Sequence, residues 1–168
     1  NSWWDVTNLA ARFDPAPYSK VETYYFDQKR FDVYERVFAD HLAPLNVTFV
    51  NEVRLRGFEI LTDTRESALG LEIAFAGTVP LRGSEKSFIH LIDPADPGRI
   101  IAQVDSPLLA GHLTAPAVLR GMPLPDKLPR RAYEIWFGIY DPTLPGEQRI
   151  PTLSGADRTL LGTVFLGR

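Results

Sequence analysis

The feature that most constrains the fold of this chain is a change in hydrophobic periodicity near Pro44. After this residue, apolar and polar side chains alternate in short runs, and turn residues separate the runs. The clearest run places apolar residues on one side of an extended segment: Leu69, Leu71, Ile73 and Phe75. Period-two alternation is typical of strands with one buried face. About seven to nine such runs predict a mainly β protein, an antiparallel β-sandwich of the Ig-like or jelly-roll-like kind.

Two local features place a turn and an irregularity within this pattern. Residues 88–92 and 99–105 both alternate, and they flank a segment rich in proline, aspartate and glycine at 94–98. Two strand-like runs around such a segment predict a β-hairpin. The alternation slips at Arg56 and Gly57. A slip at a glycine inside a strand predicts a β-bulge.

Three more strands are predicted in the last third of the chain. Residues 117–122 lie within a proline-rich surface connection and favour a short edge strand. Residues 133–140 carry aromatic side chains on both alternating faces, which favours a central strand covered on both sides. Residues 160–166 form the closing strand of the pattern. The pairing of these strands does not follow from their periodicity.

The first 45 residues have a different pattern. Residues 21–26 are β-branched and aromatic, which favours a strand. After Asp27, apolar residues recur at the spacing of one helical face: Phe31, Tyr34, Val37, Phe38, His41 and Leu42. Asp27 is suited to cap the start of a helix and Pro44 to stop it. We therefore expect an amphipathic helix over residues 27–42. The chain then divides into an aromatic arm with this helix, residues 1–45, and a β-sandwich domain, residues 46–168.

Composition narrows the classes of function. The formal net charge is -3, and no stripe of basic residues interleaves with aromatic ones, so a nucleic-acid partner is not expected. The chain has no cysteine, which excludes disulfides, thiol nucleophiles and thiolate metal sites. No apolar run approaches the ~20 residues that cross a bilayer as a helix.

Catalytic residues and cofactors are not expected. The chain has no Gly-x-Ser-x-Gly motif, and its three histidines fall in a predicted helix, a strand and a loop. Nothing in this spacing points to a Ser-His-Asp arrangement. His90 lies between Phe88 and Ile92 on one face of a strand, where a structural, hydrogen-bonded core histidine is the expected role.

Asp93 and Asp105 are weak candidates for a metal site. We expect them to face each other across the predicted hairpin, near Gln103, where two carboxylates could ligate a hard cation such as Ca²⁺. No calcium-loop motif accompanies them. The favoured interpretation is therefore structural, with both aspartates capping strand ends and accepting hydrogen bonds from turn amides. No metal ion is expected.

Aromatic residues are the better candidates for ligand binding. Exposed tryptophan and tyrosine rings can serve as stacking surfaces for sugars, although large aromatic rings more often fill cores and interfaces. The candidate residues are Trp3, Trp4, Trp136 and Tyr140. For Trp136 the core is favoured over a sugar platform. For Trp3 and Trp4 a protein interface or a membrane surface competes with core packing.

Residues 47–166 resemble a known β-sandwich module. The match is carried, in order along the chain, by VRLRGF (53–58), FIHLID (88–93), AQVDSP (102–107), LP (124–125), GIYDP (138–142) and GEQRIP (146–151). These motifs are similar to those of the C-terminal extracytoplasmic module of bacterial multi-spanning membrane glycosyltransferases of the mannosyltransferase-like type. The first 45 residues lie outside the resemblance.

The resemblance implies a location and a role. It implies an extracytoplasmic position, in the periplasm or at the cell surface, and attachment to a membrane-embedded subunit or another protein partner. In such enzymes the chemistry belongs to the membrane-embedded part, so the resemblance implies a non-catalytic accessory module, with weak carbohydrate affinity as an added expectation. The alternative is a structural subunit of a larger assembly, docked through its N-terminal segment.

Overall fold

The computed structural model describes residues 18–26, 29–36, 42–62, 68–77, 81–113, 117–145 and 148–167. In these ranges the chain is mainly β, and every strand pair is antiparallel. The described part holds a single short 3₁₀ helix, Ala110–Leu113, and no helix long and apolar enough to cross a bilayer. The prediction of a mainly β, antiparallel protein is confirmed.

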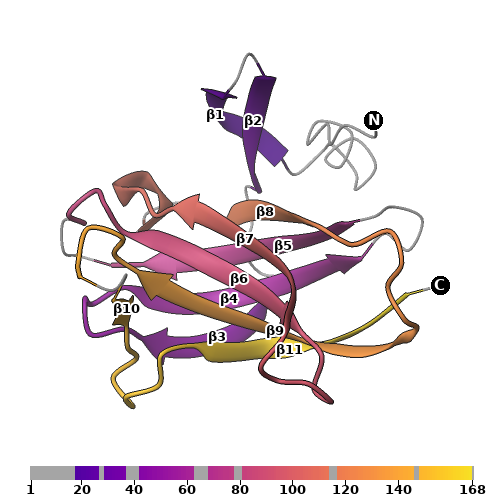
Figure 1. Ribbon diagram of the computed structural model, residues 1–168. Helices are drawn as coiled ribbons and strands as arrows, with labels where there is room; N and C mark the ends of the chain where they lie inside the picture. The colour runs from indigo at the N-terminus through magenta and orange to yellow at the C-terminus, as the bar shows by residue number, and fades with distance from the viewer. Residues whose placement is uncertain are drawn as a thin grey trace.

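A five-stranded sheet is centred on the strand β9 (Figure 1). It contains β6 (Lys86–Ile92), β7 (Ile100–Pro107), β9 (Arg131–Tyr140), β10 (Arg149–Ile150) and β11 (Thr159–Leu166). β9 pairs with β6 on one side and with both β10 and β11 on the other. The predicted central strand, the closing strand and the β6–β7 hairpin are therefore confirmed.

A four-stranded sheet contains the remaining strands of the main body, in the order β3-β4-β5-β8. These strands are β3 (Ala43–Thr48), β4 (Arg54–Thr62), β5 (Ala68–Ala76) and β8 (Val118–Pro123). The β4–β5 register shifts between Leu55 and Gly57, which confirms the predicted bulge. β8 lies at the edge of this sheet, as predicted.

Side chains from both sheets meet in one hydrophobic core. The alternating apolar residues of β5 and β9 supply much of it, and they are fully buried, as period-two burial requires. The ring of Phe137 on β9 lies with its centroid 5.7 Å from that of Phe75 on β5. The same ring makes an edge contact with Phe49, at 6.0 Å. These contacts join the two sheets through aromatic packing.

The N-terminal strands form a separate two-stranded sheet, β1 (Tyr18–Phe26) with β2 (Lys29–Arg36). β1 confirms the strand predicted at 21–26, and β2 lies against β8 of the main body. β2 differs from the helix predicted over 27–42, of which residues 27–28 and 37–41 lie outside the described residues. Phe31 and Val33 alternate with charged residues, so this short segment satisfies period two as well as the helical spacing.

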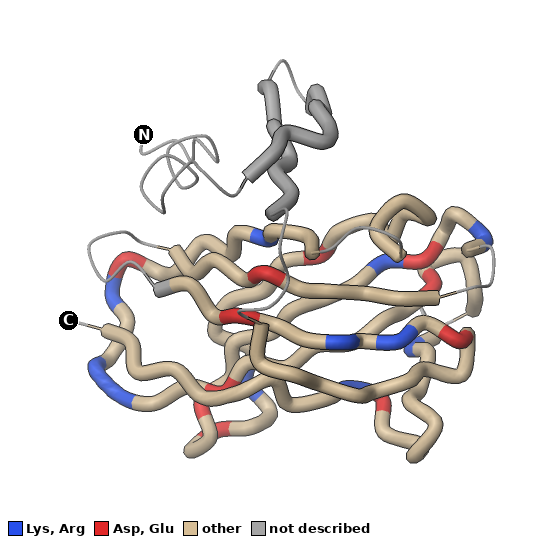
Figure 2. Tube along the Cα trace, turned by 180° about the vertical axis from the view of Figure 1, so that it is seen from behind, with Lys and Arg blue, Asp and Glu red and all other residues tan. Residues whose placement is uncertain are grey.

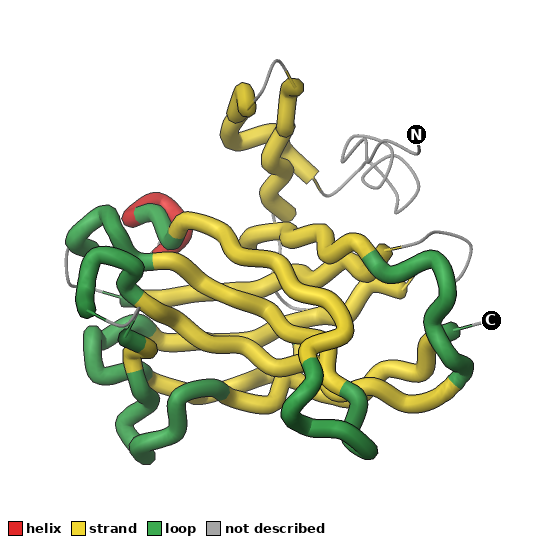
Figure 3. The backbone as a smooth tube through the Cα atoms, in the orientation of Figure 1, coloured by secondary structure: helices red, strands yellow, loops and turns green. Residues whose placement is uncertain are grey.

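Basic and acidic residues are interspersed along the described part of the chain (Figure 2). The loops gather at the two ends of the strands, away from the sheet interiors (Figure 3). At one end, the loop after β9 and the segment before β6 approach the turn between β3 and β4. The candidate site lies there.

Candidate ligand-binding site

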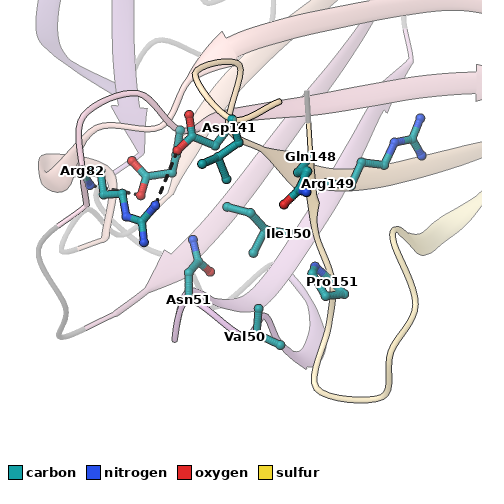
Figure 4. A pocket seen from close by; sticks show the side chains of 10 residues that line it. Val50, Asn51, Arg82, Asp141, Gln148, Arg149, Ile150 and Pro151 are labelled. Atoms are coloured by element: carbon teal, nitrogen blue, oxygen red, sulfur yellow. Dashed lines mark hydrogen bonds and ion pairs between the residues drawn. The ribbon is translucent and has the colours of Figure 1, made fainter. Parts of the chain in front are cut away.

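A pocket of about 290 Å³ lies at this end of the strands (Figure 4). Three loop segments and the short strand β10 form it. Its lining residues are Val50, Asn51, Arg82, Glu85, Asp141, Leu144, Gln148, Arg149, Ile150 and Pro151. We call it the loop-end pocket. It mixes amide, carboxylate, cationic and apolar side chains, a combination typical of small-molecule sites.

Asn51 is held in a tight turn between β3 and β4. Phe49 N donates to Val53 O at 2.8 Å, and Glu52, at φ 64°, has the left-handed backbone that this turn needs. Such a conformation is costly for a residue with a β-carbon. The Asn51 Oδ1 accepts a 3.4 Å hydrogen bond from Val53 N. This contact fixes the side-chain amide and leaves its nitrogen directed into the pocket (Figure 4).

The Nδ2 of Asn51 is buried and has no hydrogen-bond partner. An unsatisfied buried donor costs about 1–3 kcal/mol. Together with the left-handed Glu52 beside it, this donor marks a place where the fold is less stable than it could be. Strain and unsatisfied groups of this kind gather at functional sites. Among the segments that line the pocket, the turn at residues 49–53 therefore has the features most typical of a functional site.

Glu85 shapes the opposite wall. Its side chain is buried, and its two oxygens accept hydrogen bonds of 3.0 Å from the backbone nitrogens of Arg82 and Gly83. Gly83 has φ 86°, which glycine adopts without penalty. One carboxylate therefore anchors the backbone of residues 82–83, just before β6.

Asp141 anchors the loop after β9 in the same way. Its Oδ1 accepts hydrogen bonds from Thr143 N at 2.9 Å and from Thr143 Oγ1 at 2.7 Å. The hydroxyl of Thr143, followed by its backbone amide, holds the pKa of Asp141 below its usual range. Arg82 Nη1 lies 4.0 Å from Asp141 Oδ2, and the Arg82 side chain is 72% exposed. This guanidinium therefore reaches the pocket rim from solvent.

Arg149 contributes little charge to the pocket. Its guanidinium stacks over the Phe88 ring at 4.7 Å and pairs with Asp157 at 2.9 Å. Figure 4 shows this side chain extending away from Asn51 and Asp141. The polar groups that line the cavity are thus two anchored carboxylates, one rim arginine and the amides of Asn51 and Gln148.

Trp136 and Tyr140 lie elsewhere, on the face of β9 that points away from the core. Trp136 is half-buried, its Nε1 donates to Glu134 Oε2 at 2.9 Å, and the Arg158 guanidinium lies 4.7 Å over its ring. Tyr140 lies near Phe88, with ring centroids 6.2 Å apart. Neither lines the loop-end pocket. Trp3 and Trp4 lie outside the described residues.

Asp93 and Asp105 do not face each other, so this part of the sequence prediction is wrong. The β6–β7 register places Asp105 opposite Phe88 and Gln103 opposite His90, while Asp93 follows β6 at the far end of the hairpin. Asp93 accepts a 3.0 Å hydrogen bond from Ala95 N and pairs with Arg131. The turn-capping role is confirmed for Asp93. Within the described residues, no three His, Cys, Asp or Glu side chains group as metal ligands.

His90 is buried beside Phe88, with ring centroids 4.4 Å apart. Burial, followed by the positive charges of Arg149 and Arg158, lowers the pKa of His90 to about 4 against an opposing effect of Asp157. The expected buried position is confirmed. The expected hydrogen bonding is not confirmed, because Nδ1 is buried and has no hydrogen-bond partner.

The pocket residues were not identified from the sequence. Val47, Phe49 and Asn51 occur at every second position, a spacing that indicates one strand face and gives no sign of a site. The only local signal is Asn-Glu between Val50 and Val53, a turn-like pair within an apolar context. Glu85 and Asp141 gave no signal, because their roles depend on loops that meet only in the fold.

Comparisons with protein-family models, with curated proteins and with solved structures found no match to this chain. The resemblance to the glycosyltransferase module therefore stays an expectation. The function of the chain is therefore inferred from the loop-end pocket.

Proposed function

We propose that this chain is a non-catalytic β-sandwich module that serves a larger extracytoplasmic, membrane-attached protein by binding carbohydrate weakly. The observation that carries the proposal is the state of the two pocket carboxylates. Glu85 and Asp141 are both used to hold loops in place. Their arrangement builds a rigid receptor surface around the Asn51 amide.

The hydrogen bonding of these two carboxylates also favours ligand binding over catalysis. A general acid or base works best with a pKa near the ambient pH and with a free proton-transfer position. Hydrogen bonds from Thr143 lower the pKa of Asp141, so this group stays ionised at neutral pH. Glu85 holds one backbone amide with each oxygen. Both groups are therefore suited to a fixed, structural and ligand-accepting role.

The proposed sandwich rests on the shared core. Two antiparallel sheets contribute apolar side chains to one cluster, and Phe137 contacts aromatic rings from outside its own sheet. Sheets that bury one face each against a common core are the defining feature of β-sandwiches. Their strand ends present loops at two poles, and such loops commonly carry binding sites.

Titration of the full chain with a panel of oligosaccharides, followed by NMR, tests the carbohydrate part. We expect chemical-shift changes with millimolar dissociation constants, the weak range that a small polar pocket supports. A flat response across the panel would overturn carbohydrate binding. Protease accessibility of the module in spheroplasts, whose outer envelope has been opened, tests the location. Protection from added protease until the spheroplasts are lysed would contradict an extracytoplasmic position.

The alternative, a structural subunit docked through its N-terminal segment, has one observation in its favour. β1 and β2 form a sheet of their own, and a two-stranded hairpin has marginal stability unless other strands or a helix support it. A partner that adds a strand would supply that support. Deleting residues 1–36 and measuring association by sedimentation tests this function. Unchanged association would count against it.

A further inference from the structure

We infer that the loop-end pocket is a subsite for one neutral hydroxylated ring, with Asn51 Nδ2 as its main hydrogen-bond donor. This inference rests on the proposed carbohydrate binding and assigns it to a site and a ligand class. It places recognition in the pocket, whereas the candidate ligand-binding residues from the sequence were Trp3, Trp4, Trp136 and Tyr140.

The size of the pocket limits the ligand. Its volume of about 290 Å³ falls just below the range of about 300–1,000 Å³ for small-molecule sites. A volume of this size suits a single sugar ring or a comparable polyol. A longer chain would continue past the rim, over the exposed side chain of Arg82.

The polar lining matches hydroxyl groups. A hydroxyl donates one hydrogen bond and accepts others, whereas an ionised carboxylate only accepts and an amide nitrogen only donates. The pocket offers both kinds of partner, the free Asn51 Nδ2 as donor and the remaining lone pairs of Glu85 and Asp141 as acceptors. A polyol can accept a hydrogen bond from the donor and donate hydrogen bonds to the acceptors at the same time.

The apolar lining matches the other surface of such a ring. Leu144, Ile150 and Pro151 line the cavity beside the polar groups. Carbon-bound hydrogens of a sugar ring pack against aliphatic side chains of this kind, while its hydroxyls reach the polar wall. Val50, which is 52% exposed, extends this apolar part to the rim.

The charges of the pocket favour a neutral ligand over an anion. Glu85 and Asp141 are both buried, while the guanidinium of Arg149 is paired with Asp157 outside the cavity. The positive charge of Arg82 offsets only one of the two carboxylates, so the net charge of these three groups is negative. A carboxylate ligand would be repelled by the two buried carboxylates. A hard cation needs about six to eight oxygen ligands, and the described lining supplies two carboxylates that already hold backbone amides.

The test uses the full chain, labelled with ¹⁵N, and a panel of neutral methyl hexosides, with glucuronate, glucosamine and Ca²⁺ as charged comparisons. We expect the neutral hexosides to shift the amide signals of residues 49–53, 81–85 and 141–145. Asn51→Asp keeps the oxygen that accepts from Val53 N and removes the donor. It is expected to raise the hexoside dissociation constant about tenfold, the effect of one hydrogen bond of about 1.4 kcal/mol.

Trp136→Leu is the matched control, because it removes the aromatic ring of the alternative sugar platform at a residue that does not line the pocket. Loss of hexoside binding in Trp136→Leu but not in Asn51→Asp would overturn the pocket assignment and leave the carbohydrate-binding function standing. No hexoside binding by the unmodified chain would overturn both. Preferential response to glucuronate, glucosamine or Ca²⁺ would overturn the neutral ligand class. A thermal unfolding scan of each variant confirms that it is folded.

Discussion

The ring of Phe88 occupies the space that a β-carbon at Gly138 would fill. Built on Gly138, that atom would overlap Phe88 Cζ and lie 3.0 Å from the carbonyl oxygen of Asp157. The two residues face each other in the β6–β9 register. Arg149 then stacks on the far side of the same ring. The absence of a side chain at Gly138 therefore allows the loop containing Asp157 to close over the outer face of the five-stranded sheet.

Gly138→Ala is expected to lower the free energy of unfolding by about 1–3 kcal/mol, because the ring and the loop must both move to admit a methyl group. Urea denaturation measures the change. Gly121→Ala on β8 is the control, since a β-carbon there meets no atom within 4 Å. Equal effects of the two substitutions would show that overlap with Phe88 is not the cause.

Acidification is expected to destabilise the fold through His90. Its pKa is about 4 in the folded chain and 6.5 in an unfolded one. Between these values the unfolded state binds more protons, so the free energy of unfolding falls as pH drops from 6.5 toward 4. A shift of this size corresponds to about 3 kcal/mol.

Urea denaturation at pH 7 and pH 4.5 measures this fall. His112, whose pKa is also lowered to about 4, chiefly by burial, is expected to contribute a similar amount. His90→Gln should therefore remove about half of the loss on acidification. A variant as pH-sensitive as the unmodified chain would exclude His90 as a source.

Phe137→Ala is expected to lower the free energy of unfolding by about 3–5 kcal/mol, the cost of a large cavity in a close-packed core. Phe137 is fully buried and contacts both Phe49 and Phe75. Phe165, which is 62% exposed on β11, is the matched control, and Phe165→Ala should change stability by less than about 1 kcal/mol. A small effect at Phe137 would contradict a core shared by the two sheets.

Glu85→Ala is expected to loosen the loop before β6. It leaves the backbone nitrogens of Arg82 and Gly83 without their acceptor, a loss of about 1–3 kcal/mol. Hydrogen exchange followed by NMR should show faster exchange at these two amides. Asp126→Ala, in the exposed connection between β8 and β9, serves as control. If the two amides stay protected, another group anchors the loop.

The strands were predictable because each depends on its own alternation. Leu69 to Phe75 and the slip at Gly57 carry local information, and both appear in the structure as predicted. The segment around Phe31 carries two periodicities at once, so local spacing alone did not distinguish a helix from a strand. Strand elements with a single clear period were the ones that sequence reasoning located correctly.

The pocket was not predictable because it depends on long-range pairing. Asp93 and Asp105 were expected to face each other, yet the β6–β7 register sets Asp105 opposite Phe88, and Asp93 follows the end of β6 at the turn. Asn51 and Asp141 are distant in sequence and share a cavity only because β3, β4 and β9 end at the same pole. The role of a side chain at a strand end can be inferred only when the residues that lie beside it in the fold are known.

The pairing of β11 has a mechanical consequence. Among the described strands, β11 pairs with β9 alone, and Leu166 lies opposite Arg131. Tension applied between these two residues would open the pair from that end, breaking its hydrogen bonds one after another instead of shearing them together.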